Sequence, residues 1–398
     1  MSNLTITSAQ GFRAGTATCG IKQSGKTDVG ILVADSPCTA AAVFTSNRFC
    51  GAPIVVGREH VRRGRLRAIV VNSGCSNVAT GERGVADARA MCAHLAAAIG
   101  ARPTEVLPSS TGVIGEFLPM AKVRVGIDAA AAVLSASVRA GRAFAEAIMT
   151  TDTRVKLAGE RFRIGRTTVT VAGCCKGSGM IAPNMATMLG YLTTDAGLAP
   201  AQLRRLLKAA VEPTFNRVTV DECESTSDTV AMLASGLACA VTGGTAEARF
   251  AAGLRAVCES LAYQIAADGE GATRVLEVAV RGARNPRDAH AAARAIAVSP
   301  LVKTAVHGGD PNWGRIVQAL GQTRVTYRPE DVVVRLGGTI LFRKGAPAPD
   351  LDRRAVAKLM KAKHVAIEVD LGAGRAADRV LTCDLSREYV TINADYHT

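Results

Sequence analysis

Strand-like and helix-like hydrophobic patterns alternate along this chain. Short apolar runs, several with an apolar–polar period of two, predict half-buried β-strands. These runs cover residues 30–34, 68–72, 167–172, 275–280, 332–336 and 365–371. Ala-rich stretches predict helices over residues 84–99, 129–149, 201–212 and 246–267. Since the two kinds of element are interleaved along the chain, the pattern indicates an α/β protein and not an all-helical or all-strand one.

The length of the chain bounds its domain organisation. With 398 residues it can bury a large core, and two or three domains are expected. No internal repeat, low-complexity linker or heptad pattern divides it. The charged, Pro-containing stretch RNPRD suggests that a smaller second domain extends from about residue 285 to about residue 385.

Composition excludes several classes of protein. No apolar stretch is long enough to span a bilayer, and the first residues lack a secretory pattern, so a cytoplasmic protein without membrane partners is expected. The eleven cysteines show no Cys-x-x-Cys pair, and no His cluster has metal-ligand spacing. We therefore predict reduced thiols and no metal site. The adjacent Cys174 and Cys175 are interpreted as small buried residues at a strand end.

The net charge of +14 raises the question of nucleic-acid binding. Arginines cluster near residues 62–67, yet aromatic residues make up only 4% of the chain. Without interleaved aromatic residues, a stacking platform for single strands is poorly supported. A solvated basic face is favoured, and its positive field would also attract an anionic substrate.

The candidate chemistry lies in residues 176–195, which read KGSGMIAPNMATMLGYLTTD. Gly177 and Gly179 permit backbone torsions that side chains forbid, and Pro183 stops a helix. Such a loop can display one small hydroxyl residue, Thr187, although a plain loop is the simpler interpretation. If cleavage made Thr187 the first residue of a chain, its α-amine (pKa roughly 7.7–8.0) could accept the hydroxyl proton.

This run resembles the self-cleavage motif of the ornithine acetyltransferase family, the bifunctional glutamate N-acetyltransferases of arginine biosynthesis. The resemblance implies cleavage between Ala186 and Thr187, which gives an alpha chain of residues 1–186 and a beta chain of residues 187–398. These fragments would remain intertwined, two copies of each. The implied fold is of the self-processing N-terminal-nucleophile type, an α/β (α+β) fold of layered sheets flanked by helices.

Two further motifs match the same family. The segment SSTGVIG at residues 109–115 resembles its oxyanion-hole segment, with Thr111 and Gly112 at the matching positions. By itself this segment could be a strand-to-helix turn. The segment MTTDT at residues 149–153 could be a helix C-terminus, but the resemblance implies that Thr150 contacts substrate. Lys176 also matches a substrate-contacting lysine.

The C-terminal half carries the remaining motifs. Glu270, in a predicted turn before the strand at residues 275–280, matches a substrate-binding glutamate. Residues 303–315, expected to form a loop, resemble another family signature that lines or braces the site. The terminal segment alternates apolar and polar residues, and its Asn393 and Thr398 match positions that close over the substrate. The motifs thus span almost the whole chain in the family order.

The resemblance implies a ping-pong acetyl transfer from N2-acetyl-L-ornithine to L-glutamate through an acetyl-Thr187 intermediate. No metal or redox cofactor is needed, and acetyl-CoA could be a second donor in bifunctional members. Cys75 and Ser76 depart from the family pattern, which puts substrate preference in doubt more than catalysis. Two alternatives stay open, namely a self-cleaving aminopeptidase or amidohydrolase and a basic binding protein in which the Thr187 loop is only structural.

Overall fold

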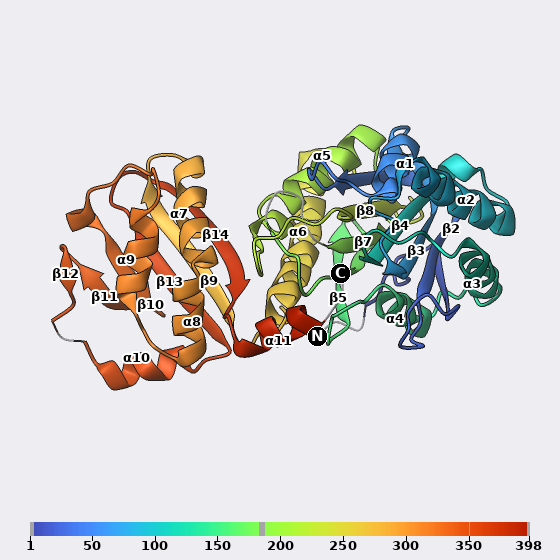
Figure 1. Cartoon of the computed structure of the whole chain (residues 1–398). Helices are drawn as coiled ribbons and strands as arrows, with labels where there is room; N and C mark the ends of the chain where they lie inside the picture. Colours follow the sequence, from blue (N-terminus) through green and yellow to red (C-terminus); the bar gives the residue numbers. More distant parts are fainter. Residues whose placement is uncertain (1–3, 183–187, 350, 396–398) are drawn as a thin grey trace. The chain divides into compact units, whose positions relative to one another are not determined.

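The computed structural model describes residues 4–182, 188–349 and 351–395, and it divides into two compact units. The first unit comprises Met1–Asn216 and Cys223–Ala262, and the second comprises Arg217–Glu222 and Tyr263–His397. Figure 1 shows sheets and flanking helices in each unit. The predicted α/β class, with layered sheets and helices, is confirmed.

Among the described residues, the first unit is built on an eight-stranded sheet of order β4-β3-β2-β8-β7-β6-β5, with β1 also paired to β2. The β3–β4 and β7–β8 pairs of this sheet are parallel, and its other described pairs are antiparallel. Its strands are β1 (Phe12–Ala17), β2 (Val29–Phe44), β3 (Arg65–Cys75), β4 (Val106–Val113), β5 (Lys156–Ile164), β6 (Thr167–Lys176), β7 (Leu189–Thr194) and β8 (Thr229–Ala234).

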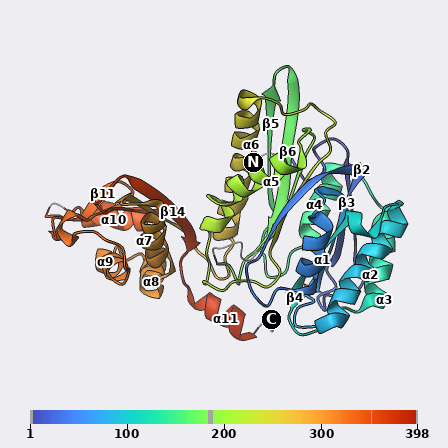
Figure 2. The same ribbon diagram turned by 90° about the horizontal axis from the view of Figure 1, so that it is seen from above.

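Successive side chains of β2 point to opposite faces of the sheet and are apolar on both, which explains why helices cover both faces. Ile31 and its alternate neighbours pack into one core with residues of α2 and α3, whereas Leu32 packs into a second core with Phe144 of α4. Figure 2 shows α2 and α3 side by side. The helices are α1 (Ala52–Val61), α2 (Gly81–Ile99), α3 (Met120–Ala132), α4 (Val138–Ala147), α5 (Pro200–Val211) and α6 (Gly244–Ala267).

One predicted helix of this unit is wrong in its extent. Residues 129–149 were expected to form a single helix, but α3 ends at Ala132 and α4 begins at Val138. Between them, the backbone of Ser135 exchanges two hydrogen bonds with Ala14 (2.9 and 3.0 Å). The Ser137 hydroxyl then accepts a hydrogen bond from the Ala140 N–H and caps α4. Serine side chains that bond to nearby backbone favour such a break over a continuous helix.

The second unit has a six-stranded sheet of order β12-β11-β10-β13-β9-β14 among the described residues. The β13–β9 pair is parallel and the others are antiparallel. The strands are β9 (Val275–Ala283), β10 (Val333–Leu336), β11 (Thr339–Arg343), β12 (Ala346–Pro347), β13 (His364–Asp370) and β14 (Ala376–Cys383). The helices are α7 (Pro286–Val298), α8 (Pro300–Gly308), α9 (Trp313–Gly321), α10 (Arg353–Met360) and α11 (Arg387–Asp395). In the chain as a whole, short 3-10 helices lie at Pro103–Glu105, Phe215–Arg217 and Pro329–Asp331.

One segment of this unit differs from the sequence-based expectation. Residues 303–315 are not a loop, because α8 runs to Gly308 and α9 begins at Trp313. Gly309, with φ +72°, ends α8, and the Asn312 side chain caps α9. The alternating C-terminal segment forms the helix α11. Within the described residues, no helix combines the length and the apolar character that a membrane span requires.

Candidate active site

The predicted cleavage point lies outside the described residues, as do Thr187, Ala186 and the terminal Thr398. The strands before and after it are neighbours in the sheet of the first unit. Strand β6 ends at Lys176 and β7 begins at Leu189, and these two residues are direct partners in the antiparallel pair. The carbonyl of Met188 accepts a hydrogen bond from the Thr229 N–H (3.0 Å). The segment that carries the predicted nucleophile therefore leaves and rejoins the sheet at one strand end.

Thr111 and Gly112 lie at the end of β4, which corrects the expectation of a loop or a strand-to-helix turn. They are paired with Ser73 and Gly74 of the parallel strand β3, and the register shifts at Cys75 in a β-bulge. Gly112 has φ +128°, and a side chain there would overlap the backbone of Gly74. A bulge disrupts the regular pairing of a strand and redirects its groups. The strand end can thus present backbone and hydroxyl donors as an oxyanion hole requires.

A buried side-chain network stabilises this bulge. The Ser110 hydroxyl donates to Oδ1 of Asn72 (2.6 Å), and Nδ2 of Asn72 donates to the Cys75 carbonyl (2.8 Å). Since successive residues of a strand point to opposite faces, Ser110 and Thr111 face away from each other. The network thus supports the strand from the face opposite to the predicted oxyanion donor.

Thr150 and Lys176, both predicted substrate contacts, lie close together in the structure. The Lys176 ammonium donates to the Thr150 hydroxyl over 3.5 Å, and both residues are half-buried. Thr150 follows the C-terminal end of α4, whereas Lys176 ends β6. Their roles in substrate binding remain predictions, but the structure places them side by side at the strand end from which residue 177 continues.

Asp152 is a site residue that motif matching missed. Its Oδ1 accepts hydrogen bonds from the Gly177 N–H (2.7 Å) and the Lys156 ammonium (2.6 Å), and its Oδ2 accepts one from the Thr150 N–H (3.2 Å). Burial raises the pKa of Asp152, but Lys156, Lys176 and the hydrogen bonds outweigh it, so the pKa lies below its usual value. The carboxylate therefore joins the segments that carry Thr150 and Lys176.

Asp228 is a second buried acid, and it lies beside Met188, the first described residue after the predicted cleavage point. It directly precedes β8, as Met188 directly precedes the parallel strand β7. Only 4% of Asp228 is exposed, and its Oδ2 has no hydrogen-bond partner within the described residues. Burial raises the pKa of Asp228 well above its usual value, although Lys176 and Ser225 oppose this shift. A carboxyl group in this environment is stabilised in its neutral form.

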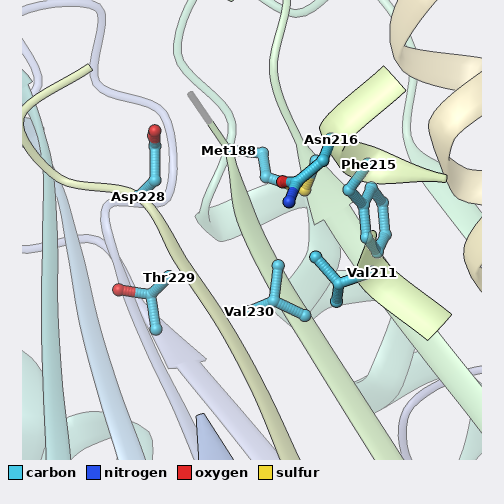
Figure 3. A pocket seen from close by; sticks show the side chains of 7 residues that line it. All are labelled: Met188, Val211, Phe215, Asn216, Asp228, Thr229 and Val230. Atoms are coloured by element: carbon cyan, nitrogen blue, oxygen red, sulfur yellow. The ribbon is translucent and has the colours of Figure 1, made fainter. Parts of the chain in front are cut away.

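Figure 3 shows Asp228 at the edge of a small pocket that lies beside Met188. The pocket is lined by Met188, Val211, Phe215, Asn216, Asp228, Thr229 and Val230. Most of these side chains are apolar. The pocket is therefore suited to an apolar group and not to a charged one.

The second unit contains two of the predicted substrate contacts, which are hydrogen-bonded to each other. Nδ2 of Asn393, on α11, donates to Oε2 of Glu270 over 2.9 Å. Glu270 lies in the turn between α6 and β9, as the sequence predicted, and is largely buried. The Ser386 hydroxyl donates to the Gly271 carbonyl (2.7 Å) and ties this turn to the segment before α11.

The same turn is held by a buried carboxylate that the motifs did not indicate. Asp384 accepts hydrogen bonds from the backbone N–H groups of Thr273 (2.7 Å) and Arg274 (2.8 Å). A ring nitrogen of His307, on α8, lies 2.8 Å from Oδ2 of Asp384. Burial raises the pKa of Asp384, but the bonds from Thr273 and His307 outweigh it and leave the pKa lowered. His307 belongs to residues 303–315, the segment that was expected to line or brace the site. Through Asp384, this segment supports the turn that carries Glu270.

Cysteine thiols are a further kind of reactive side chain in this protein. All eleven cysteines lie in described parts of the chain and are free thiols. Cys174 and Cys175 are buried near the end of β6, as predicted. Among the described residues, no group of three or more His, Cys, Asp or Glu side chains is arranged to hold a metal ion.

Comparison with known proteins identifies the class of enzyme to which this layered α/β fold belongs, namely the acyltransferases. The model of the ArgJ family matches residues 13–398. The chain therefore belongs to the ArgJ family, whose members act in arginine biosynthesis.

Individual relatives give the same result. The chain is 46% identical over 398 residues to the arginine biosynthesis bifunctional protein ArgJ of Symbiobacterium thermophilum, covering 99% of this chain and 98% of the relative. It is 41% identical to the Bacillus subtilis protein of the same name, covering 99% and 96%. A crystal structure of ArgJ from Bacillus halodurans is 40% identical with a TM-score of 0.50, and it covers 52% of this chain and 98% of the solved chain.

Proposed function

We propose that this protein transfers an acetyl group from N2-acetyl-L-ornithine to L-glutamate, giving L-ornithine and N-acetyl-L-glutamate. One observation carries the proposal. Thr150, Lys176 and the Gly177 N–H are gathered around Asp152 at the strand end from which the segment with Thr187 departs. Family membership over residues 13–398 supports the same reaction.

The first step of the proposal is self-cleavage. The Thr187 hydroxyl attacks the Ala186 carbonyl, the peptide bond becomes an ester, and water hydrolyses the ester to free the Thr187 amine and the Ala186 carboxylate. The Bacillus halodurans chain supports this step, since almost all of it matches only about half of the present chain. That length is expected of one fragment. Two copies of each fragment would form the mature enzyme.

The second step is a ping-pong transfer. The Thr187 hydroxyl attacks the acetyl carbon of N-acetylornithine while the free α-amine takes its proton, and Thr111 and Gly112 stabilise the oxyanion. Ornithine leaves with its amine, and the amine of glutamate then attacks the acetyl-Thr187 ester. Thr150, Lys176, Glu270, Asn393 and Thr398 would contact the substrates.

The chemistry of the proposed reaction requires no metal or redox cofactor, since every proton transfer can use the Thr187 amine. Acetyl-CoA would be the second acetyl donor, in keeping with the word bifunctional in the names of the relatives. We place the enzyme in the cytoplasm, where its thiols would stay reduced.

The deciding experiment measures the intact mass and the N-terminal sequences of the purified protein. Two fragments, one beginning at Thr187, are expected, whereas Thr187→Ala should give one unbroken, inactive chain. Acetyl transfer by Thr187→Ala would contradict the mechanism. Turnover that depends on glutamate separates the transferase from a self-cleaving aminopeptidase or amidohydrolase, in which water would resolve the acyl-threonine.

A further inference from the structure

Lys22 lies between the two parts of the candidate site in the first unit. Its side chain packs against Gly74, because a Cβ placed on Gly74 would lie 3.2 Å from Cγ of Lys22. Gly74 is the β3 partner of Gly112. The Lys22 ammonium donates to the carbonyls of Thr27 (2.8 Å) and Ala147 (3.2 Å). Ala147 ends α4, three residues before Thr150, so Lys22 connects the oxyanion segment with the substrate-contact segment.

The ammonium of Lys22 retains binding capacity. A lysine ammonium has three donors, and only two of those of Lys22 have acceptors in the part of the chain that the structure describes. The nearby Asp28 carboxylate is occupied by the backbone N–H groups of Cys19 (2.8 Å), Ile21 (2.7 Å) and Lys22 (3.2 Å). One donor of a half-buried cation is therefore available to a ligand.

The charges around Lys22 favour an anionic ligand. The attractive charges that act on it are those of Asp28 and Asp152, and the repulsive ones are those of Lys26 and Lys176. The charge of Asp152 is already balanced by Lys156, whose ammonium lies 2.6 Å from its Oδ1. Burial lowers the pKa of Lys22 to about 8. A bound carboxylate would therefore stabilise the charged form of Lys22.

We propose that Lys22 is a specificity-determining residue that binds the side-chain carboxylate of a dicarboxylic acceptor amino acid. The proposal rests on the acetyl transfer proposed above. Two lysines from different segments, Lys22 and Lys176, match the two carboxylates of glutamate.

The test compares Lys22→Met, Lys22→Gln and Lys22→Arg with Lys26→Met in the cleaved enzyme. Lys26 is an exposed lysine of the same loop, so Lys26→Met removes an equal charge without the contacts of Lys22. For each variant, KM and kcat are measured with glutamate and with glutamine as acceptors. Self-cleavage and the unfolding temperature report whether the variant folds.

We expect Lys22→Met to raise the KM for glutamate by roughly tenfold to a hundredfold, the range for a lost hydrogen bond to a charged group. The KM for glutamine should change little, so the preference for glutamate should fall by the same factor. Lys22→Arg should recover part of the preference, and Lys26→Met should retain it.

Lys22→Gln separates recognition from a structural role, because its amide can still donate to the carbonyls of Thr27 and Ala147. A wild-type preference for glutamate in Lys22→Gln would overturn the proposal. An equal loss for both acceptors in Lys22→Met would overturn it too. If the wild-type enzyme shows no glutamate-dependent transfer, the proposed function itself fails, which is a different result.

Discussion

The ammonium of Lys156 lies 2.6 Å from Oδ1 of Asp152, and the two side chains are only 1% and 0% exposed. Replacing both members of such a buried pair by apolar side chains often leaves the stability of a protein unchanged or increases it, because both charges lose their hydration on folding. Removing one partner is costly, since the other charge is then buried alone. Here the carboxylate also binds the N–H groups of Thr150 and Gly177. The pair therefore couples the stability of the first unit to the placement of the substrate contacts.

Lys156→Met should destabilise the protein by about 3–5 kcal/mol, because it leaves the Asp152 charge buried without its partner. Urea unfolding followed by circular dichroism measures this loss. The exposed pair of Arg13 and Asp35 is the matched control, since its side chains are 43% and 55% exposed. Asp35→Asn should cost less than about 1 kcal/mol. Equal losses in the two variants would show that burial of the Asp152 pair has no special effect.

Thr111→Val should lower kcat by about 10²- to 10³-fold, the usual effect of removing one oxyanion-hole donor. The KM should remain near the wild-type value, since the hydroxyl is expected to act on the transition state. Steady-state rates of acetyl transfer provide the measurement. Ser110→Ala is the control on the other face of β4, where the hydroxyl binds Asn72. It should lower stability and leave kcat near the wild-type value. A greater loss of kcat in Ser110→Ala would contradict the assignment.

Gly112→Ala should reduce both activity and stability. A Cβ at residue 112 would overlap the backbone of Gly74, which can move only by distorting the β3–β4 pair, and φ +128° disfavours any side chain. Gly100→Ala is the matched control, because Gly100 also has positive φ (+65°) but has nothing within 4 Å of the added Cβ. The control should cost about 1–2 kcal/mol of stability and no activity. Acetyl-transfer rates and unfolding temperatures of the two variants test this prediction.

Asp228→Asn should stabilise the protein at neutral pH. Above the unfolded pKa of aspartic acid, the unfolded chain has lost a proton that the folded protein still holds on Asp228, because its folded pKa is raised. The wild-type stability contributed by this group therefore falls as the pH rises from about 4 towards the folded pKa. Asparagine has nearly the same shape and does not titrate.

Unfolding temperatures of the wild type and Asp228→Asn at pH 4, pH 5.5 and pH 7 test this sign. The unfolding temperature of the variant should increase relative to that of the wild type as the pH rises. A variant that is less stable at pH 7 would mean that Asp228 is charged there, balanced by Lys176. That outcome would contradict the neutral carboxyl group.

Several features were predictable because they depend on local patterns. The apolar run at residues 30–34 predicted a strand, and these residues lie in β2, which contributes to two cores. Glu270 was placed correctly in a turn, since Gly269 and Gly271 flank it. The continuous helix over residues 129–149 was wrong because helix propensity competes with pairing to Ala14, which lies far away in the sequence.

The sequence by itself determined the α/β class through its local hydrophobic patterns. It indicated the order of the motifs and the residues expected to react through their resemblance to the ornithine acetyltransferase family. Only the tertiary structure decided that Asp152, Lys22 and Asp228 join or border the site. Burial and neighbouring charges control the behaviour of these groups. Both arise where strands and loops that are distant in the sequence meet, so no local pattern could reveal them.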